Sequence, residues 1–215
     1  MISTDIIIPR LETIQRRSLI AAAVGVVLCL IGAFTLRERF FQSYLFAFTF
    51  FTNISLGCLA LVMLHHMTNG KWSYAIQRFL EAGMKTIPLM ILFFIPVLLG
   101  MSDLYPWMHP EQLREVALKK IGYLNQPFFI GRTVFYFAVW SLMAVFLARW
   151  SRAQDLDGAR PRTGALRKLS APGIVIYALT VTFAATDWVM SLEPDWHSTI
   201  YGMMFMVDQA LAALT

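Results

Sequence analysis

The stretch that decides the fold is residues 18–36, which read SLIAAAVGVVLCLIGAFTL. It contains no charged residue and is bounded by Arg17 on one side and Arg37 on the other. A helix needs about 20 apolar residues to cross a hydrocarbon core of about 30 Å. Because lipid offers the backbone no hydrogen-bonding partner, a spanning segment of this kind must be helical. We therefore predict a first transmembrane helix here, retained in the protein and not removed as a signal peptide.

Further apolar stretches follow the first one along the chain. They cover residues 42–64, 84–100, 127–150, 171–192 and 198–215. Pro96 is expected to kink the third helix, because an interior proline removes a helix hydrogen bond. A longer polar loop, residues 102–126, separates the third helix from the fourth. The predicted fold is an all-α polytopic membrane protein with about six transmembrane helices. In this fold, residues 1–17 precede a transmembrane domain over residues 18–215.

The composition of the chain agrees with lipid as its solvent. Of its residues, 58% are hydrophobic and 14% are charged, and the mean hydropathy is +0.60. Soluble domains carry about a quarter charged residues. The net charge of +5 lies in the loops, where it sets topology and meets anionic lipid, so it does not indicate nucleic-acid binding. Cys29 and Cys58 lie inside apolar stretches, and we predict that both are small core residues.

The basic residues also predict how the chain is oriented in the membrane. Most of the 18 Lys and Arg residues fall on one side of the predicted topology, in residues 10–17, 71–85 and 149–168. By the positive-inside rule this side, and with it the N-terminus, is cytoplasmic. The loop of residues 102–126 and the connection at residues 187–197 then face outward.

The connection between the fifth and sixth helices, DWVMSLEPDWH at residues 187–197, is rich in titratable groups. Asp187 and His197 are candidates on the outer face, because a quinol site needs an acceptor for each hydroxyl proton. A structural role for Asp187 at the end of its helix is an equal alternative. Arg132 lies on the same predicted face. It could extend to lipid phosphate, as is usual for such a residue, or pair with Asp187 or a ligand oxygen.

A second group of ionisable residues suggests a proton path. Asp208 lies about 15 Å along the last predicted helix, near the middle of the bilayer, where an unpaired charge is costly. The alternative for Asp208 is a hydrogen bond to a neighbouring helix. His65 and His66 end the second helix on the cytoplasmic side, either as ordinary interfacial residues or as the mouth of such a path. Together with Asp187 and Lys85, which also has the interfacial alternative, they form a candidate proton path.

The sequence offers no ligand set for a redox cofactor. Haem between helices needs histidines on facing helices, but His65 and His66 are adjacent, and His109 and His197 fall in loops. Iron–sulfur clusters need about four cysteines, and the chain has 2. We therefore predict that the chain binds no metal or redox cofactor. Asn53, in the middle of the second helix, is predicted to form hydrogen bonds between helices.

Residues 187–202, DWVMSLEPDWHSTIYG, resemble a motif of a known family, the NrfD-like (polysulfide-reductase-type) membrane subunits of bacterial alternative complex III. Residues 43–67, which contain the His-His pair, and residues 78–107, around MKTIP at 84–88, look like the same family. The likeness covers most of residues 18–215 and is closer to the ActF subunit than to its relative. The imidazole of His197 stands two positions later than the family's histidine.

The resemblance implies an integral membrane subunit of a quinol:cytochrome c (electron acceptor) oxidoreductase in the bacterial inner membrane. The family fold is built from four-helix bundles, and its members are about twice this length, so the chain is expected to be the N-terminal half of a truncated or split subunit. The implied roles are structural, quinol-binding and proton-conducting, without independent catalysis by this chain. The implied quinol is menaquinol or ubiquinol.

The resemblance also implies the composition of the assembly. The expected partners are a second NrfD-like membrane subunit, an iron–sulfur subunit, multihaem cytochrome c subunits, lipid and a terminal oxidase. Haem c and iron–sulfur clusters are expected in those partner subunits. Two alternatives remain open at the level of sequence. One is a proton-coupled secondary transporter, which would also use carboxylates near the bilayer midplane, and the other is a purely structural membrane subunit.

Overall fold

The computed structural model describes residues 4–68, 73–157 and 163–215, and every regular element within these ranges is helical. The longer helices are α1 (Thr4–Thr35), α2 (Arg37–Thr68), α3 (Gln77–Met84), α4 (Ile87–Leu99), α7 (Gln126–Asp157), α8 (Thr163–Trp188) and α9 (Tyr201–Ala212). Short elements connect them: α5 (Met101–Leu104), η2 (Pro106–Met108), η3 (Pro110–Gln112), α6 (Glu115–Leu118) and η4 (Met190–Leu192). The predicted all-α class is confirmed.

Several helical segments are long and apolar enough to cross a membrane, which supports a membrane-embedded protein. They are the 5 segments Thr13–Thr35, Arg39–Thr68, Gln77–Leu99, Gln126–Gln154 and Thr163–Leu192. These segments correspond to the first 5 of the six predicted spans. α9 has 12 residues and is therefore about 18 Å long, shorter than the hydrocarbon core. The predicted span at residues 198–215, and with it a total of six, stays a prediction.

The helices are longer than the apolar stretches that predicted them. α1 already begins at Thr4, inside the predicted N-terminal segment of residues 1–17, of which residues 1–3 lie outside the described part. α2, α7 and α8 likewise extend into polar flanks. Hydropathy marks only the part of a helix that suits lipid, whereas the backbone hydrogen bonds continue into polar sequence. This difference explains the predicted boundaries that were too narrow.

The third predicted span, residues 84–100, is interrupted near its start. A turn at Lys85 and Thr86 separates α3 from α4. Pro88 explains this position, because its ring removes an N–H and clashes with the carbonyl four residues before it. Pro96 instead lies inside α4. The interruption next to Pro88 was not predicted from the sequence, whereas α4 continues through Pro96, where the predicted kink stays a prediction.

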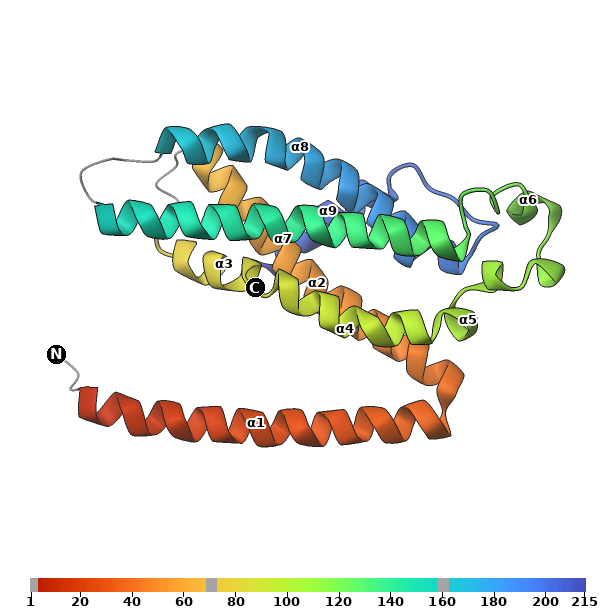
Figure 1. The fold of residues 1–215 in the computed structure, drawn as a ribbon, viewed down its shortest axis with the longest axis horizontal. Coiled ribbons are helices and arrows are strands. Elements are labelled where there is room, and N and C mark those ends of the chain that lie inside the picture. The colour runs from red at the N-terminus through yellow and green to blue at the C-terminus, as the bar shows by residue number, and fades with distance from the viewer. Residues whose placement is uncertain (1–3, 69–72, 158–162) are drawn as a thin grey trace.

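α2 is the central helix of the bundle (Figure 1). It packs against α3, α4, α8 and α9, while α7 packs against α4 and α8. The core between these helices is aromatic. The side chains of Trp140, Phe129, Phe94 and Trp188 are buried, and the rings of Trp140 and Trp188 meet edge to face with centroids 5.8 Å apart. Edge-to-face pairs of this kind add about 0.5–1.5 kcal/mol beyond the burial of their area.

The contact between α2 and α9 depends on a glycine. A Cβ atom added to Gly57 would lie 1.8 Å from the backbone oxygen of Gln209 and 2.9 Å from the Cβ of Ala213. No side chain fits at such distances, so the two backbones approach closely only because residue 57 has none. Small residues serve the same purpose where helices pack in membranes.

α1 runs beside the bundle and joins it through α2 (Figure 1). The apolar window of its spanning segment is 0% buried. Cys29 is consequently exposed, and its predicted place in the core is wrong, whereas Cys58 is buried as predicted. The error has a simple cause, because an apolar helix that faces lipid has the same composition as one that faces protein. Phe34, with 88% of its surface exposed, illustrates how little of α1 the chain itself covers.

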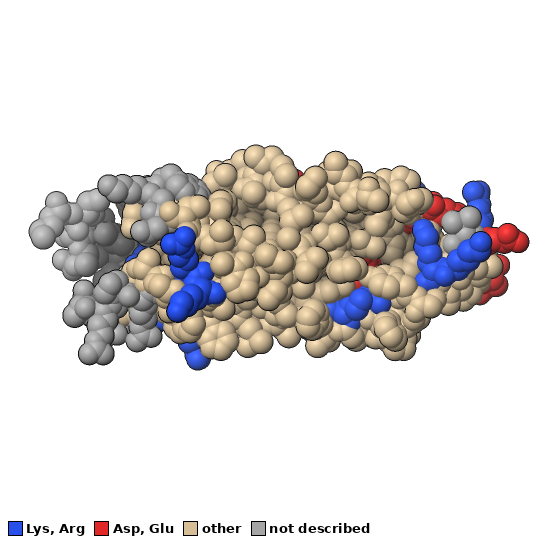
Figure 2. All heavy atoms as spheres, turned by 90° about the horizontal axis from the view of Figure 1, so that it is seen from above, with Lys and Arg blue, Asp and Glu red and all other residues tan. Residues whose placement is uncertain are grey.

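Charged side chains gather at the two ends of the molecule, and a wide belt between them is almost free of charge (Figure 2). We call the end that carries residues 100–125 and 189–200 the loop end. We call the opposite end, where α3, the last turns of α7 and the first turns of α8 lie, the basic end. The uncharged belt has the character expected of a surface in contact with hydrocarbon.

Candidate functional site

The loop end is built around an ion pair between Arg132 of α7 and Asp187 of α8. Arg132 Nε lies 2.8 Å from Asp187 Oδ2, and Arg132 Nη2 lies 2.9 Å from Oδ1, so the pair is bidentate. The side chain of Asp187 is 0% exposed and that of Arg132 is 17% exposed. Arg132 was predicted either to extend to lipid phosphate or to pair with Asp187 or a ligand oxygen. The structure shows the pairing with Asp187. It joins two helices that are far apart in the sequence.

Further hydrogen bonds complete this ion pair. Tyr136, one turn after Arg132 on α7, donates its hydroxyl to Asp187 Oδ2 at 2.7 Å. Arg132 Nη1 donates to the backbone oxygen of Tyr123 at 3.1 Å. Removing two charges from water is costly, and a buried pair is retained only where geometry and added hydrogen bonds offset that cost. Here both conditions are met, so the pair is a fixed and electrically matched element.

Tyr123 connects the ion pair to the surface. The guanidinium carbon of Arg132 lies 3.8 Å from the centroid of its ring, which is a close cation–π contact. Burial, followed by the nearby Asp187 carboxylate, raises the pKa of Tyr123 to about 12, although Arg132 acts in the opposite direction. Its phenol is therefore neutral at physiological pH and keeps a proton to donate.

Residues of the long loop hold the connection after α8 in place. Tyr105 donates its hydroxyl to the backbone oxygen of Trp188 at 3.0 Å, and Trp107 Nε1 donates to Ser191 Oγ at 3.3 Å. Burial, with a smaller effect from Asp187, raises the pKa of Tyr105, which stays a donor. Nothing in the sequence-based prediction singled out Tyr105, Tyr123 or Tyr136. Only Tyr136 had a usable signal, because it stands four positions after Arg132 on one helix face.

A cavity of about 400 Å³ opens at the loop end beside the ion pair. It is lined by Lys119, Lys120, Tyr123, Leu124, Thr186, Met190, Ser191, Pro194, Trp196 and His197. His197 is exposed there, whereas Asp187 and Arg132 lie behind Tyr123 and do not line the cavity. The structure therefore brings Asp187, Arg132 and His197 to one end of the molecule. Only His197 among these three lines the cavity.

A second polar cluster links α2, α8 and α9. Asn53 Nδ2 donates to Asp208 Oδ2 at 3.0 Å, and Gln209 Nε2 donates to Asn53 Oδ1 at 3.1 Å. Tyr177 donates its hydroxyl to Gln209 Oε1. Gln209 is buried, while Asp208 is exposed on the surface of the bundle. The prediction that Asn53 forms hydrogen bonds between helices is confirmed, and Asp208 has the predicted alternative of such a bond.

A third polar cluster lies at the basic end. His65 and His66 are both buried by the protein, and both alternatives considered for them, an interfacial position and the mouth of a proton path, stay predictions. α3 and the last turns of α7 and first turns of α8 cover this end of α2. His65 Nδ1 lies 2.5 Å from Ser73 Oγ, whereas His66 Nε2 is buried with no hydrogen-bond partner among the described residues. Both histidines line a cavity of about 260 Å³.

Glu81 is a buried acid of this third cluster that the sequence analysis did not select. It is 3% exposed and accepts hydrogen bonds from Ser151 at 2.5 Å, Arg78 at 3.0 Å and Gln77 at 3.1 Å. Its sequence context, an amphipathic segment with polar neighbours, gave no sign of burial. Lys85, one turn later, lies in a different cavity. The predicted path residues thus fall into separate places, with no continuous chain of hydrogen bonds between them in the described part.

A cavity of about 10 Å³ lies beside the second cluster, and its lining includes Asn53 and Gln209 together with Trp140 and Trp188. About this much space holds one water molecule. Thr52 also lines it, and its hydroxyl has no hydrogen-bond partner among the residues that the structure describes. A single water would satisfy that group. Asn53 and His65 lie about 18 Å apart along α2.

Within residues 4–68, 73–157 and 163–215, no group of three or more His, Cys, Asp or Glu side chains is arranged to hold a metal ion. No protein-family model matches the chain, and no curated protein sequence matches it.

Proposed function

We propose that the chain is a membrane subunit of a quinol:electron acceptor oxidoreductase complex and that a quinol head group binds in the loop-end cavity. The cavity has the volume of a small-molecule site, which is about 300–1,000 Å³, and an apolar lining with a few polar groups. The observation that carries the proposal is the position of Tyr123. It lines this cavity and lies on the guanidinium of Arg132, so a rigid, matched ion pair stands directly behind one wall.

The chemistry of the cavity suits a quinol. The aromatic surfaces of Trp196 and Tyr123 offer an apolar wall for the ring. The phenol of Tyr123 keeps its proton and interacts with the Asp187 carboxylate, so its ring is held in the cavity wall as a fixed aromatic surface. We assign to the His197 imidazole, which lines the cavity, the acceptance of one quinol hydroxyl proton and its transfer to water, and the second hydroxyl proton leaves directly to water at the open mouth of the cavity. Arg132 and Asp187 do not line the cavity, and we assign them the role of holding Tyr123.

Quinol oxidation also needs an acceptor for two electrons, which this proposal places in partner subunits. An iron–sulfur subunit and multihaem cytochrome c subunits would receive the electrons from menaquinol or ubiquinol. A second NrfD-like membrane subunit and a terminal oxidase belong to the same proposed assembly. The uncovered apolar surface of α1 supports a partner in the membrane, because most of this spanning helix is left uncovered by the rest of the described chain.

The proposed proton-conducting role uses the second and third polar clusters. Asp208, Asn53 and Gln209 form hydrogen bonds to one another between the loop end and the two histidines, and we assign to them the middle of the path. From Asn53 to His65 a proton would need further water along about 18 Å of α2. His66, buried with a free ring nitrogen in the described part, and its cavity are the proposed opening at the basic end.

Quinone binding can be measured through Trp196, because quinones quench tryptophan fluorescence on contact. The full chain in lipid nanodiscs is titrated with a short-chain menaquinone or ubiquinone analogue. We expect saturable quenching that Trp196→Phe largely removes. His197→Ala should weaken binding about three- to tenfold, the contribution of one hydrogen bond. His109→Ala is the matched control, because His109 also lies at the loop end but does not line the cavity.

Two results would contradict the proposal at different levels. If quenching persists unchanged in Trp196→Phe, or if His109→Ala weakens binding as much as His197→Ala, the quinone does not bind in this cavity. If the affinity-tagged chain, isolated from its native membrane, carries neither iron–sulfur nor haem c proteins, the assignment to a quinol-oxidising complex is wrong. Iron content and the haem c absorption spectrum of the isolated complex provide the second measurement.

A further inference from the structure

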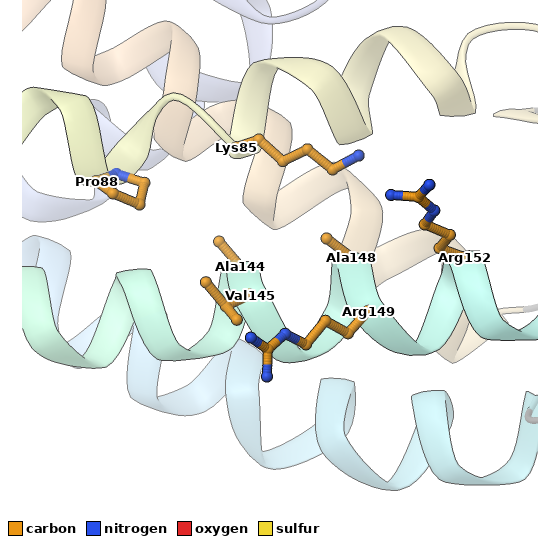
Figure 3. A pocket seen from close by; sticks show the side chains of 7 residues that line it. All are labelled: Lys85, Pro88, Ala144, Val145, Ala148, Arg149 and Arg152. Carbon is orange, nitrogen blue, oxygen red and sulfur yellow. The ribbon is translucent and has the colours of Figure 1, made fainter.

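A separate cavity at the basic end is surrounded by cations. It has a volume of about 340 Å³ and lies between the turn at Lys85, the start of α4 and the last turns of α7. Lys85 and Arg152 extend toward the same space from facing helices, and Arg149 lies along α7 at its edge (Figure 3). The remaining lining residues are Pro88, Ala144, Val145 and Ala148. Three positive charges therefore share one hollow whose lining contains no acid.

No acid neutralises these cations in the part of the chain that the structure describes. Lys85, Arg149 and Arg152 form no ion pair there. Glu81, one turn before Lys85, is buried and already accepts hydrogen bonds from Ser151 and from its own helix. Like charges this close repel one another, and a bound anion removes that repulsion. The hollow is consequently complementary to an anionic group with several acceptor oxygens, such as a phosphate.

The same seam between α4 and α7 continues as an apolar groove. A further cavity of about 270 Å³ is lined by Ile91, Phe94, Ile95, Leu98, Ile130, Thr133, Val134, Phe137 and Ala138. On α4, Pro88 of the cationic cavity and Ile91 and Ile95 of the apolar one follow the spacing of a single helix face. On α7, Ala148 and Ala138 lie about 15 Å apart, half of a hydrocarbon core. The cationic cavity and the apolar groove thus follow one another along the seam. The separation of Ala148 and Ala138 is about the depth of one leaflet.

We propose that this seam binds an anionic phospholipid, with the phosphate at Lys85 and Arg152, Arg149 at the edge of the same cavity, and an acyl chain along α4 and α7 toward Ala138. Free phosphate would use the cations but not the apolar groove, and a neutral lipid would use the groove but leave the cations unmatched. Each basic residue near a membrane surface adds to the binding of anionic lipid. The site is independent of the loop-end cavity, so it holds whether or not a quinol binds there.

Lipid retention by the full chain tests the head-group site. The purified protein is titrated with phosphatidylglycerol or phosphatidylcholine in detergent, and bound lipid is counted by native mass spectrometry. We expect preferential retention of phosphatidylglycerol, weakened on the order of 10-fold or more in Lys85→Gln/Arg152→Gln. Arg167→Gln/Lys168→Gln is the matched control, because it removes two exposed charges from α8 at the same end. Equal weakening in both double variants would overturn the proposal. Circular dichroism of each variant verifies that the helices remain folded.

The acyl groove is tested by filling it. Ala138→Phe places a ring in the apolar cavity, and Leu142→Phe, one turn later on the exposed surface of α7, is its control. Only Ala138→Phe should reduce phosphatidylglycerol retention. If inorganic phosphate displaces the lipid and Ala138→Phe has no effect, the ligand is a free anion. If phosphatidylcholine is retained equally well, the cations do not select the head group. Either result overturns the lipid proposal.

Discussion

Arg132 and Arg152 are the same residue type at opposite ends of α7, yet they differ in burial and in their partners. Arg132 is largely buried and fully matched by the Asp187 carboxylate, the Tyr123 carbonyl and the Tyr123 ring. Arg152 is exposed beside Lys85 and has no ion-pair partner among the described residues. Within the described residues, the chain supplies every partner of the first and no ion-pair partner of the second. A buried charge needs its partner for the fold to hold, whereas an unmatched charge at a cavity is available for an external anion.

This comparison predicts the largest effect at the ion pair. Asp187→Leu leaves the Arg132 charge buried without its partner, which costs about 3–5 kcal/mol of unfolding free energy. Arg152→Leu should change that free energy by no more than about 0.5 kcal/mol, because it is an exposed residue without partners. Unfolding of both variants in mixed micelles with increasing denaturing detergent, followed by circular dichroism, measures the two values.

A double variant separates the lost charge from lost packing. Arg132→Met/Asp187→Leu replaces both charges with apolar side chains, and a buried ion pair exchanged in this way is often close to neutral in stability. We expect the double variant to recover most of the loss seen in Asp187→Leu. If it is as unstable as the single variant, the pair contributes through its geometry and not through charge matching, and the contrast between the two ends of α7 fails.

Close backbone packing gives the next largest effect and tests whether the loop end depends on α9. Gly57→Ala puts a methyl group where 1.8 Å separates it from the Gln209 backbone, so α9 must shift. Overpacking of this kind costs about 1–3 kcal/mol. Gly25→Ala is the control, because a Cβ there meets nothing within 4 Å, and it should leave stability unchanged or raise it by up to about 1 kcal/mol. The same unfolding experiment compares them.

The outcome also bears on the polar cluster that α9 contributes. A shift of α9 moves Gln209 away from Asn53 and Tyr177 and therefore disturbs the second polar cluster. Quinone binding at the loop end should stay the same, because none of these residues lines the loop-end cavity. Loss of quinone quenching in Gly57→Ala would show that the two regions are coupled. An unfolding free energy equal to that of the wild-type protein would mean that α9 is not packed against α2 in the membrane.

Composition and hydropathy predicted most of the fold, because lipid allows only a narrow choice of backbone structure. The same one-dimensional signal could not separate Cys29, which faces outward, from Cys58, which faces the core. It also did not predict the turn at Lys85 and Thr86, because Pro88 and Pro96 are equal as prolines and local packing decides where a helix is interrupted. Hydropathy gives neither the direction in which a side chain points nor the position at which packing interrupts a helix.

The sequence predicted those residues of the candidate site that carry a charge within an apolar stretch. Arg132 and Asp187 are ionisable groups in apolar sequence, and the cost of burying them made a pairing a natural alternative. Tyr105 and Tyr123 carry no such cost, so nothing in the sequence marked them before the loop was folded. His65 and His66 were expected at an interface because they end an apolar stretch. α3 and the ends of α7 and α8 cover them, and that cover is a property of tertiary structure.

The smallest predicted effect concerns the other acid of the candidate path. Asp208 is exposed and accepts a hydrogen bond from Asn53, in contrast to Asp187 with its saturated environment. Asp208→Asn should change the unfolding free energy by no more than about 0.6 kcal/mol, the average contribution of a polar contact between membrane helices. Its effect should appear in function: with the intact complex in sealed vesicles, proton release per quinol should fall while quinol affinity is kept. If proton release is unchanged, Asp208 serves only the packing of α9 on α2, and the proposed route does not pass through it.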